Sequence, residues 1–271
     1  MKNVIEFCSE NVKKFHKKQM PKKKWTIEMH EGVMAGEIIN PIESVAIYVP
    51  MGKGAFPSVA MMASIPAVIA GVKNPIILTP PKENGKINSA TLVAASIAGV
   101  KNIFKCGGVQ AIAAAAYGTQ SIPKCLKVVG PGSPWISAAK TLLSGEIDTG
   151  SPAGPSEAII LADESANGKI AALDLLIEAE HGSDSSAYLI TNSEKVALDA
   201  LNEIPNFWKK MSTNRVLFSS DVLSGPSGGI ILVNDIIDAI EFINEYAPEH
   251  LQILSDNPDI YLDEIKNAGE I

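Results

Sequence analysis

From residue 46 onward, short runs of apolar and mostly β-branched residues alternate with longer alanine-rich stretches. Short continuous apolar runs are typical of strands buried on both faces, and the longer stretches have the length of helices. The pattern predicts strands at 46–50, 75–79, 102–106 and 127–130, and helices at 59–71, 89–99, 109–117 and 135–143. Strands separated by helices predict a parallel sheet with helices on both faces.

The second half of the chain repeats this pattern. Strands are predicted at 158–162, 187–191 and 229–233, and helices at 169–180, 194–203 and 236–246. The repeat predicts an α/β fold of two similar Rossmann-like lobes, each a doubly wound parallel sheet. We assign residues 46–157 to the first lobe, and residues 1–45, which look helical and then extended, together with 158–271 to the second.

Composition and charge narrow the environment of the protein. Apolar residues make up 46% and charged residues 20%, as in soluble globular proteins. The net charge of -7 argues against a nucleic-acid partner, because phosphate binding rests on an excess of lysine and arginine. The three cysteines show no close pairing motif, and the apolar stretch at 59–72 is interrupted by Pro66. We therefore expect a cytoplasmic protein with neither a membrane nor a nucleic-acid partner.

Four loops rich in glycine and proline follow or precede the predicted strands, at 48–54, 106–110, 129–135 and 152–157. We place all four at strand ends where ligands bind in such folds. Glycine lets backbone amides approach a ligand, and a following helix N-terminus favours anionic groups. The loops predict a nucleotide-sized ligand, although neither lobe carries Gly-x-Gly-x-x-Gly, and glycine and proline also simply end strands.

Two acid–histidine pairs are candidates for chemistry. Glu178 and His181 are three residues apart at a predicted helix end, so both side chains can reach one metal ion or one cationic substrate. Glu249 and His250 are adjacent between a helix and a strand, and an imidazole is suited to act as a general base near neutral pH. For each pair a purely structural role is the alternative.

Six short motifs occur in a fixed order along the chain: Tyr-Val-Pro at 48–50, Gly-Gly-Val-Gln-Ala at 107–111, Val-Gly-Pro-Gly at 129–132, Pro-Ala-Gly-Pro-Ser-Glu at 152–157, Ala-Glu-His-Gly-Ser-Asp-Ser at 179–185 and Tyr-Ala-Pro-Glu-His-Leu at 246–251. Each motif is weak alone, but together they resemble the histidinol dehydrogenase family. The resemblance runs from about residue 14 to the last residue.

The resemblance implies oxidation of a small amino alcohol, L-histidinol to L-histidine through the aldehyde, in two NAD-dependent steps of histidine biosynthesis. It implies that Glu249 activates the water that hydrates the aldehyde, and that His250 removes the proton from the alcohol and later from the hydrate. It also implies that Tyr48, Gln110 and Ser133 line the NAD site, which makes residues 46–157 the NAD-binding lobe.

The resemblance assigns substrate and metal binding to the other lobe. Ser156, Glu178 and His181 would contact the substrate, and Glu178 with His181 would supply half of a zinc site that orients it. Members of the family are homodimers, so a homodimer is expected here as well.

Several residues depart from the family pattern. Glu178 stands where the family usually has Gln, and Ser133, followed by Trp135, stands where it usually has Asn. The family continues beyond the position of Ile271 and supplies further zinc ligands there, so the sequence as given is not expected to hold zinc tightly. Two alternatives follow: a divergent or truncated paralogue that oxidises another alcohol with NAD, and a non-catalytic nucleotide-binding protein.

Overall fold

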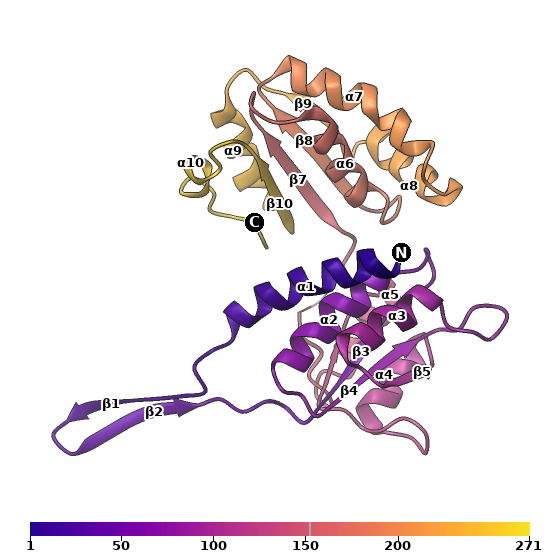
Figure 1. Ribbon diagram of the computed structural model, residues 1–271, viewed down its shortest axis with the longest axis vertical. Helices are drawn as coiled ribbons and strands as arrows, with labels where there is room; N and C mark the ends of the chain where they lie inside the picture. The colour runs from indigo at the N-terminus through magenta and orange to yellow at the C-terminus, as the bar shows by residue number, and fades with distance from the viewer. Residues whose placement is uncertain (152) are drawn as a thin grey trace. The chain divides into compact units, whose positions relative to one another are not determined.

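The computed structural model describes residues 1–151 and 153–271, and the chain divides into two compact units. Unit 1 comprises Met1–Gly154, and unit 2 comprises Pro155–Ile271. Each unit contains a four-stranded sheet in which neighbouring strands are parallel. Figure 1 shows helices packed on the four-stranded sheet of each unit. The predicted α/β fold with parallel sheets is confirmed.

The sheet of unit 1 has the strand order β5-β4-β3-β6. Its strands are β3 (Ser44–Tyr48), β4 (Asn74–Thr79), β5 (Asn102–Lys105) and β6 (Lys127–Val129). The helices that follow these strands are α2 (Pro57–Ile69), α3 (Ser89–Ala98), α4 (Val109–Tyr117) and α5 (Pro134–Leu142). Every predicted strand and helix of this part of the chain is present, with bounds that differ by at most two residues.

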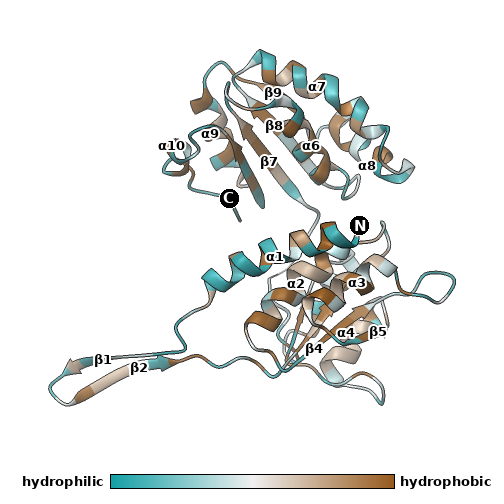
Figure 2. Cartoon of the chain, viewed as in Figure 1, coloured by the Kyte–Doolittle hydropathy of each residue, from teal (hydrophilic) through white to brown (hydrophobic). Residues whose placement is uncertain are grey.

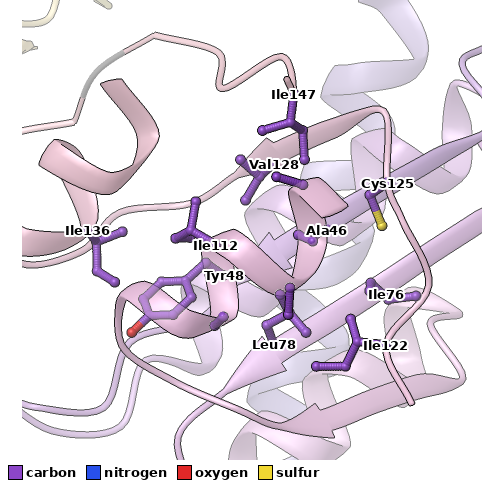
Figure 3. Packing of buried hydrophobic residues seen from close by; sticks show 14 residues of the cluster. Ala46, Tyr48, Ile76, Leu78, Ile112, Ile122, Cys125, Val128, Ile136 and Ile147 are labelled. Atoms are coloured by element: carbon purple, nitrogen blue, oxygen red, sulfur yellow. The ribbon is translucent and has the colours of Figure 1, made fainter. Parts of the chain in front are cut away.

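Alternate residues of β3 pack on opposite faces of this sheet, as the two-residue period of a strand requires. Ala46 and Tyr48 belong to a buried cluster with residues of α4 and α5 (Figure 3). Val45 and Ile47 belong to a second buried cluster with residues of α2 and α3. All five residues of β3 are buried, which is why the residues after Ser44 read as a continuous apolar run.

The sheet of unit 2 has the order β10-β7-β8-β9. Its strands are β7 (Glu157–Ala162), β8 (Ser186–Thr191), β9 (Gly228–Leu232) and β10 (His250–Leu254). Its helices are α6 (Gly168–Ala179), α7 (Glu194–Trp208), α8 (Thr213–Ser224), α9 (Ile236–Tyr246) and the short α10 (Asp259–Leu262). Figure 2 shows hydrophobic residues concentrated on the strands, while α7 carries hydrophilic residues along its length.

Both sheets share one topology. In each, the first strand is central, the next two follow on one side, and the fourth pairs with the other side of the first. The strand order therefore reverses, and this reversal lies between the neighbouring strands β3 and β6 in unit 1 and between β7 and β10 in unit 2. In open parallel sheets, ligands bind beyond the carboxyl ends of the strands at such reversals.

The N-terminal residues belong to unit 1, which corrects our assignment of residues 1–45 to the second lobe. Helix α1 (Lys2–Gln19) buries Ile5 in the cluster that α2 and α3 form on the sheet. The hairpin of β1 (Lys24–His30) and β2 (Val33–Ile38) then extends from this unit (Figure 1). The spacing of apolar residues on α1 predicts a buried face but does not say which sheet it covers.

Residues 59–72, the longest apolar stretch of the sequence, form most of α2 and pack on the sheet of unit 1. None of the helices in the described part of the chain has the length and apolar composition needed to span a membrane.

Candidate functional site

Tyr48 ends strand β3 at the carboxyl edge of the sheet in unit 1. Its ring is buried among Ile112 of α4 and Ile136 of α5 (Figure 3), and its hydroxyl accepts a hydrogen bond from the backbone N–H of Gly108 at 3.1 Å. Gly108 is the N-cap residue of α4 and has a φ of 71°. Tyr48 thus joins the end of the central strand to the start of the helix after β5.

Backbone segments approach each other closely along this edge. A Cβ atom at Gly130, which directly follows β6 and has a φ of +109°, would lie 2.2 Å from the backbone oxygen of Tyr48. A Cβ atom at Gly107 would lie 2.5 Å from Cβ of Pro80. Only glycine fits these positions, so the edge around the reversal between β3 and β6 is lined by backbone. Such an edge is suited to the close approach of a dinucleotide.

The three predicted cofactor residues all lie at this edge. Tyr48 and Gln110 meet at Gly108, since the Gln110 side-chain oxygen lies 2.7 Å from where a Gly108 Cβ would be. Ser133 is the N-cap residue of α5, and its carbonyl oxygen accepts hydrogen bonds from the backbone N–H groups of Ile136 and Ser137. Gln110 and Ser133 are exposed, so their side chains are accessible to a ligand.

Lys140 is a residue of this edge that we did not predict. It lies on α5, is only 6% exposed, and donates a hydrogen bond from Nζ to the carbonyl oxygen of Gly130 at 2.5 Å. Burial lowers the pKa of Lys140. The sequence held one signal, because Lys140 is four residues after Ile136 and so falls on the apolar face of the helix.

A cavity of about 690 Å³ lies elsewhere in unit 1. It is lined mainly by α2 and by residues 39–42, and it reaches the amino ends of β3 and β6 through Val45 and Lys127. Its lining is mostly apolar and holds no acid–base pair, so we do not assign it to the cofactor or the reaction.

The remaining candidates lie at the amino-terminal edge of the sheet in unit 2, which corrects our placement of the 152–157 loop at carboxyl strand ends. Pro152 is outside the described residues, but Ser156 directly precedes β7, and its carbonyl oxygen accepts a hydrogen bond from the N–H of Ser186 at 2.9 Å. Ser186 starts β8, and His250, which starts β10, pairs with Ala158 of β7. Ser156 and His250 therefore share one edge of this sheet.

Helix α6 brings the first acid–histidine pair to the same edge, because it runs back from the end of β7 to the start of β8. Oε2 of Glu178 lies 4.0 Å from Nδ1 of His181, and that nitrogen lies 3.2 Å from the carbonyl oxygen of Glu178. The neighbouring Glu180 forms an ion pair with Arg215 of α8 at 3.0 Å, which ties the helix end to the unit. Glu180 thus has a structural role.

His250 lies between two carboxylates. Its Nδ1 is 2.5 Å from Oε1 of Glu270, and its Nε2 is 3.7 Å from Oε2 of Glu249. Glu270 reaches this position because residues 269–271 run beside β10. The N–H of Glu270 donates to the carbonyl oxygen of Glu249, and the N–H of Leu251 donates to the carbonyl oxygen of Glu270. The imidazole is one third exposed, so solvent and small molecules can reach it.

Ala247, just before this segment, has a φ of 54°, the single positive value for a non-glycine residue among residues 1–151 and 153–271. It ends α9 by donating its N–H to the carbonyl oxygen of Ile243. A left-handed conformation at alanine costs about 1–2 kcal/mol, and such strain is common beside functional sites. The turn at Ala247 sets the direction in which Glu249 and His250 leave the helix.

The described residues do not form a complete zinc site. No group of three or more His, Cys, Asp or Glu side chains in that part of the chain is arranged to hold a metal ion. Glu178 and His181 are two adjacent candidate ligands, whereas a catalytic zinc site ordinarily has three protein ligands. The donor set of residues 1–151 and 153–271 therefore does not fit zinc on its own.

Comparison with known proteins gives the family of the chain. A family model described as histidinol dehydrogenase matches residues 1–271. The chain belongs to the histidinol dehydrogenase family. The resemblance that six short motifs predicted is thereby confirmed.

Two curated relatives illustrate the similarity. A protein named histidinol dehydrogenase homolog from Rhizobium meliloti (strain 1021) is 56% identical over 98% of this chain and 59% of its own length. A protein named histidinol dehydrogenase from Synechocystis sp. is 49% identical over 100% of this chain and 62% of its own. The chain thus spans about three fifths of the length of these members of the histidinol dehydrogenase family.

Solved structures agree with this assignment. The crystal structure of histidinol dehydrogenase from Elizabethkingia anophelis matches with a TM-score of 0.88 and 39% identity, over 99% of this chain and 61% of that one. An acetylating aldehyde dehydrogenase from Geobacillus thermoglucosidasius matches with a TM-score of 0.56 but only 17% identity, which shows a shared fold alone.

Proposed function

We propose that this member of the histidinol dehydrogenase family takes part in the NAD-dependent oxidation of L-histidinol to L-histidine through the aldehyde, as in histidine biosynthesis. The observation that carries the proposal is the imidazole of His250, accessible and held between Glu249 and Glu270. An alcohol can be oxidised only if its hydroxyl proton leaves with the hydride, so a positioned base is the first requirement.

His250 supplies that base through Nε2. The hydrogen bond between Nδ1 and the Glu270 carboxylate favours the tautomer that carries its proton on Nδ1, which leaves the lone pair on Nε2. At 3.7 Å from Glu249, Nε2 lies beyond hydrogen-bond distance and can accept the hydroxyl proton of the alcohol. NAD, when bound, accepts the hydride. A positioned general base typically contributes about a hundredfold to ten-thousandfold to the rate.

Glu249 acts in the second half of the reaction. Its carboxylate is about half exposed, so water reaches it. It removes a proton from the water that adds to the aldehyde carbon, while His250 returns the proton that it took from the alcohol to the aldehyde oxygen, which forms the hydrate and leaves His250 neutral. His250 then takes a hydroxyl proton from the hydrate as the second hydride leaves. An acid and an imidazole on consecutive residues thus serve two successive oxidations without a change of site.

The carboxyl edge of unit 1 is our candidate NAD site. The glycines at 107, 108 and 130 leave backbone exposed to a ligand, and Tyr48, Gln110 and Ser133 surround them. The starts of α4 and α5 lie at this edge, where helix N-termini favour the anionic pyrophosphate. This arrangement takes the place of the usual Gly-x-Gly-x-x-Gly loop, which is missing from the sequence.

Ser156, Glu178 and His181 are our candidate substrate contacts. Substrate ammonium or imidazole groups suit a carboxylate, a histidine and a hydroxyl on one edge of unit 2. Glu178 and His181 are also the candidate zinc ligands. The steps assigned to His250 and Glu249 use no metal, because Glu178 and His181 do not complete a zinc site. A homodimer and a cytoplasmic location are further parts of the proposal. Sedimentation velocity tests whether the protein is a homodimer.

The direct test supplies the purified chain with L-histidinol and NAD, and follows NADH by absorbance and L-histidine by chromatography. We expect both products, with NADH formed twice for each histidine because each of the two oxidations reduces one NAD. No NADH from L-histidinol, or from a panel of amino and sulfo alcohols, would overturn the assignment as a dehydrogenase.

A paralogous NAD-dependent alcohol dehydrogenase with another substrate is the second candidate, and one observation favours it. Four curated relatives at 55–56% identity are named histidinol dehydrogenase homolog or homolog 2, whereas four relatives named histidinol dehydrogenase are 39–49% identical. A carboxylate at 178 changes which substrate charge is tolerated. The same panel distinguishes the two candidates: the paralogue predicts a higher kcat/KM for an alcohol other than L-histidinol.

A further inference from the structure

Lys140 is a charged residue in an apolar setting. It lies on α5 and is only 6% exposed. Lysine is seldom buried to this degree unless it is paired with an acid, because removing an ammonium ion from water is costly. None of the ion pairs found among the described residues includes Lys140, and its hydrogen bond goes to the carbonyl oxygen of Gly130.

This hydrogen bond connects Lys140 to the carboxyl edge of the sheet in unit 1. Side chains on a helix lean toward its N-terminus, which is how Lys140 reaches back along α5 to Gly130. Gly130 directly follows β6, and its backbone lies against that of Tyr48 at the reversal between β3 and β6. The ammonium group is thus bonded to the first residue of the loop 130–133, which connects that close contact to Ser133 and the start of α5.

The cost of this burial argues for a function. Replacing a buried charge by an apolar side chain of similar volume is often neutral or stabilising. For stability alone, methionine would therefore serve at this position as well as lysine or better. Two properties distinguish it from methionine: a donor that fixes the direction of the Gly130 carbonyl, and a positive charge at an edge suited to an anionic ligand.

We propose that Lys140 is a positioning residue of the cofactor site: by holding the Gly130 carbonyl, it fixes the 130–133 loop in the form that binds the pyrophosphate of NAD, and its charge favours that anion. This inference rests on the proposed function, since it takes NAD as the ligand. It predicts that the lysine affects NAD binding more than folding.

The test compares Lys140→Met, Lys140→Gln and Lys140→Arg with the wild type. Calorimetric titration with NAD should show a Kd about ten- to a hundredfold higher for Lys140→Met, the range expected for loss of a charge-assisted interaction. The midpoint of urea unfolding should change little. Lys140→Gln keeps a donor without the charge and Lys140→Arg keeps both, so their Kd values should lie between those of Lys140→Met and the wild type.

Two further measurements separate positioning from general damage. In the ligand-free protein, hydrogen exchange of a peptide covering 129–137 should be faster in Lys140→Met, while peptides of unit 2 are unchanged. Titration with ADP should show the same loss as NAD, whereas adenosine, which has no phosphate, should bind equally to both proteins. The matched control is Lys101→Met, an exposed lysine just before β5, which should leave all of these values unchanged.

The outcomes are distinguishable. If the wild type binds NAD and Lys140→Met binds it equally well with unchanged exchange in 129–137, the role of Lys140 is overturned and the proposed function stands. If the wild type binds no NAD, the proposed function fails and the role of Lys140 fails with it. If Lys140→Met does not fold, Lys140→Gln and Lys140→Arg decide, and equal Kd values for both and the wild type overturn the inference.

Discussion

Gly130→Ala tests whether the carboxyl edge of unit 1 depends on the close approach of two backbones. The substitution adds one methyl group. At a φ of +109° an L-residue is strained by about 1–2 kcal/mol. The new Cβ would lie 2.2 Å from the backbone oxygen of Tyr48, which no side-chain rotation can relieve, and such overpacking costs about 1–3 kcal/mol. Alanine also restricts the unfolded chain, which returns about 0.4–1 kcal/mol.

The expected net loss is therefore about 1–4.5 kcal/mol, compared with the 5–15 kcal/mol that stabilises a typical domain. Because this loss falls on one edge, hydrogen exchange measured by mass spectrometry is the suitable assay. Peptides of β3 and β6 should exchange about fivefold to a thousandfold or more faster, since each 1.4 kcal/mol is a factor of ten. Peptides of unit 2 serve as an internal reference.

Gly145→Ala is the matched control, because a Cβ there would meet no atom within 4 Å. It should change the same exchange rates by less than about a factor of two or three. NAD binding, measured by calorimetry, should weaken in Gly130→Ala and not in Gly145→Ala. If both variants exchange and bind alike, the close contact between Gly130 and Tyr48 does not shape this edge, and the candidate cofactor site loses its main structural support.

Three other changes test the edge of unit 2 and its fold. Glu249→Gln should slow oxidation of the supplied aldehyde by about a hundredfold and that of the alcohol much less, because only the aldehyde needs water activation; equal slowing would contradict this role. Glu270→Gln should lower kcat about tenfold with unchanged circular dichroism, since the side chain is 69% exposed and acts by orienting His250; an unchanged kcat would show that Glu270 does not orient the ring. Burial raises the pKa of Asp163, but hydrogen bonds from Ser165, Ser255 and Tyr261 outweigh it and hold the pKa below its usual range. Its carboxylate therefore stabilises the fold above the unfolded pKa of about 3.9, and this effect is lost as pH falls through the folded value. Asp163→Asn should lower the free energy of unfolding, measured with urea, by about 2 kcal/mol at neutral pH and by less in acid. A difference that does not change with pH would refute the linkage.

The sequence predicted elements well where local patterns decide them. The apolar run at 75–79 became β4 because its central residues are buried on both faces of a parallel sheet. The helix expected at 236–246 has those same bounds, because Asp235 caps it and Ala247 ends it. The hydrophobic pattern missed α8, since its residues from Thr213 to Ser224 are mostly polar and only two of them are buried.

What the sequence could not supply were contacts between distant segments. The order of strands depends on which side of β3 or β7 the chain returns to, and no local pattern records that. The 152–157 loop was placed at the wrong end of its strand for a different reason: it precedes the strand predicted at 158–162, so its place at an amino end could be read from the sequence. Glu270 reaches His250 across 20 residues of chain, and Lys140 meets Gly130 only once α5 has folded back on β6. Tyr48, Gln110 and Ser133 were found through motifs, and their roles stay predictions.

The measurement that tests the central claim most directly is the initial rate of NADH formation from L-histidinol by the His250→Ala variant. His30→Ala is the matched control, because that histidine is exposed on the hairpin of unit 1. Removal of the base should lower the rate by about a hundredfold or more, while the control keeps the wild-type rate. An active wild-type protein whose rate is the same after His250→Ala would contradict the account.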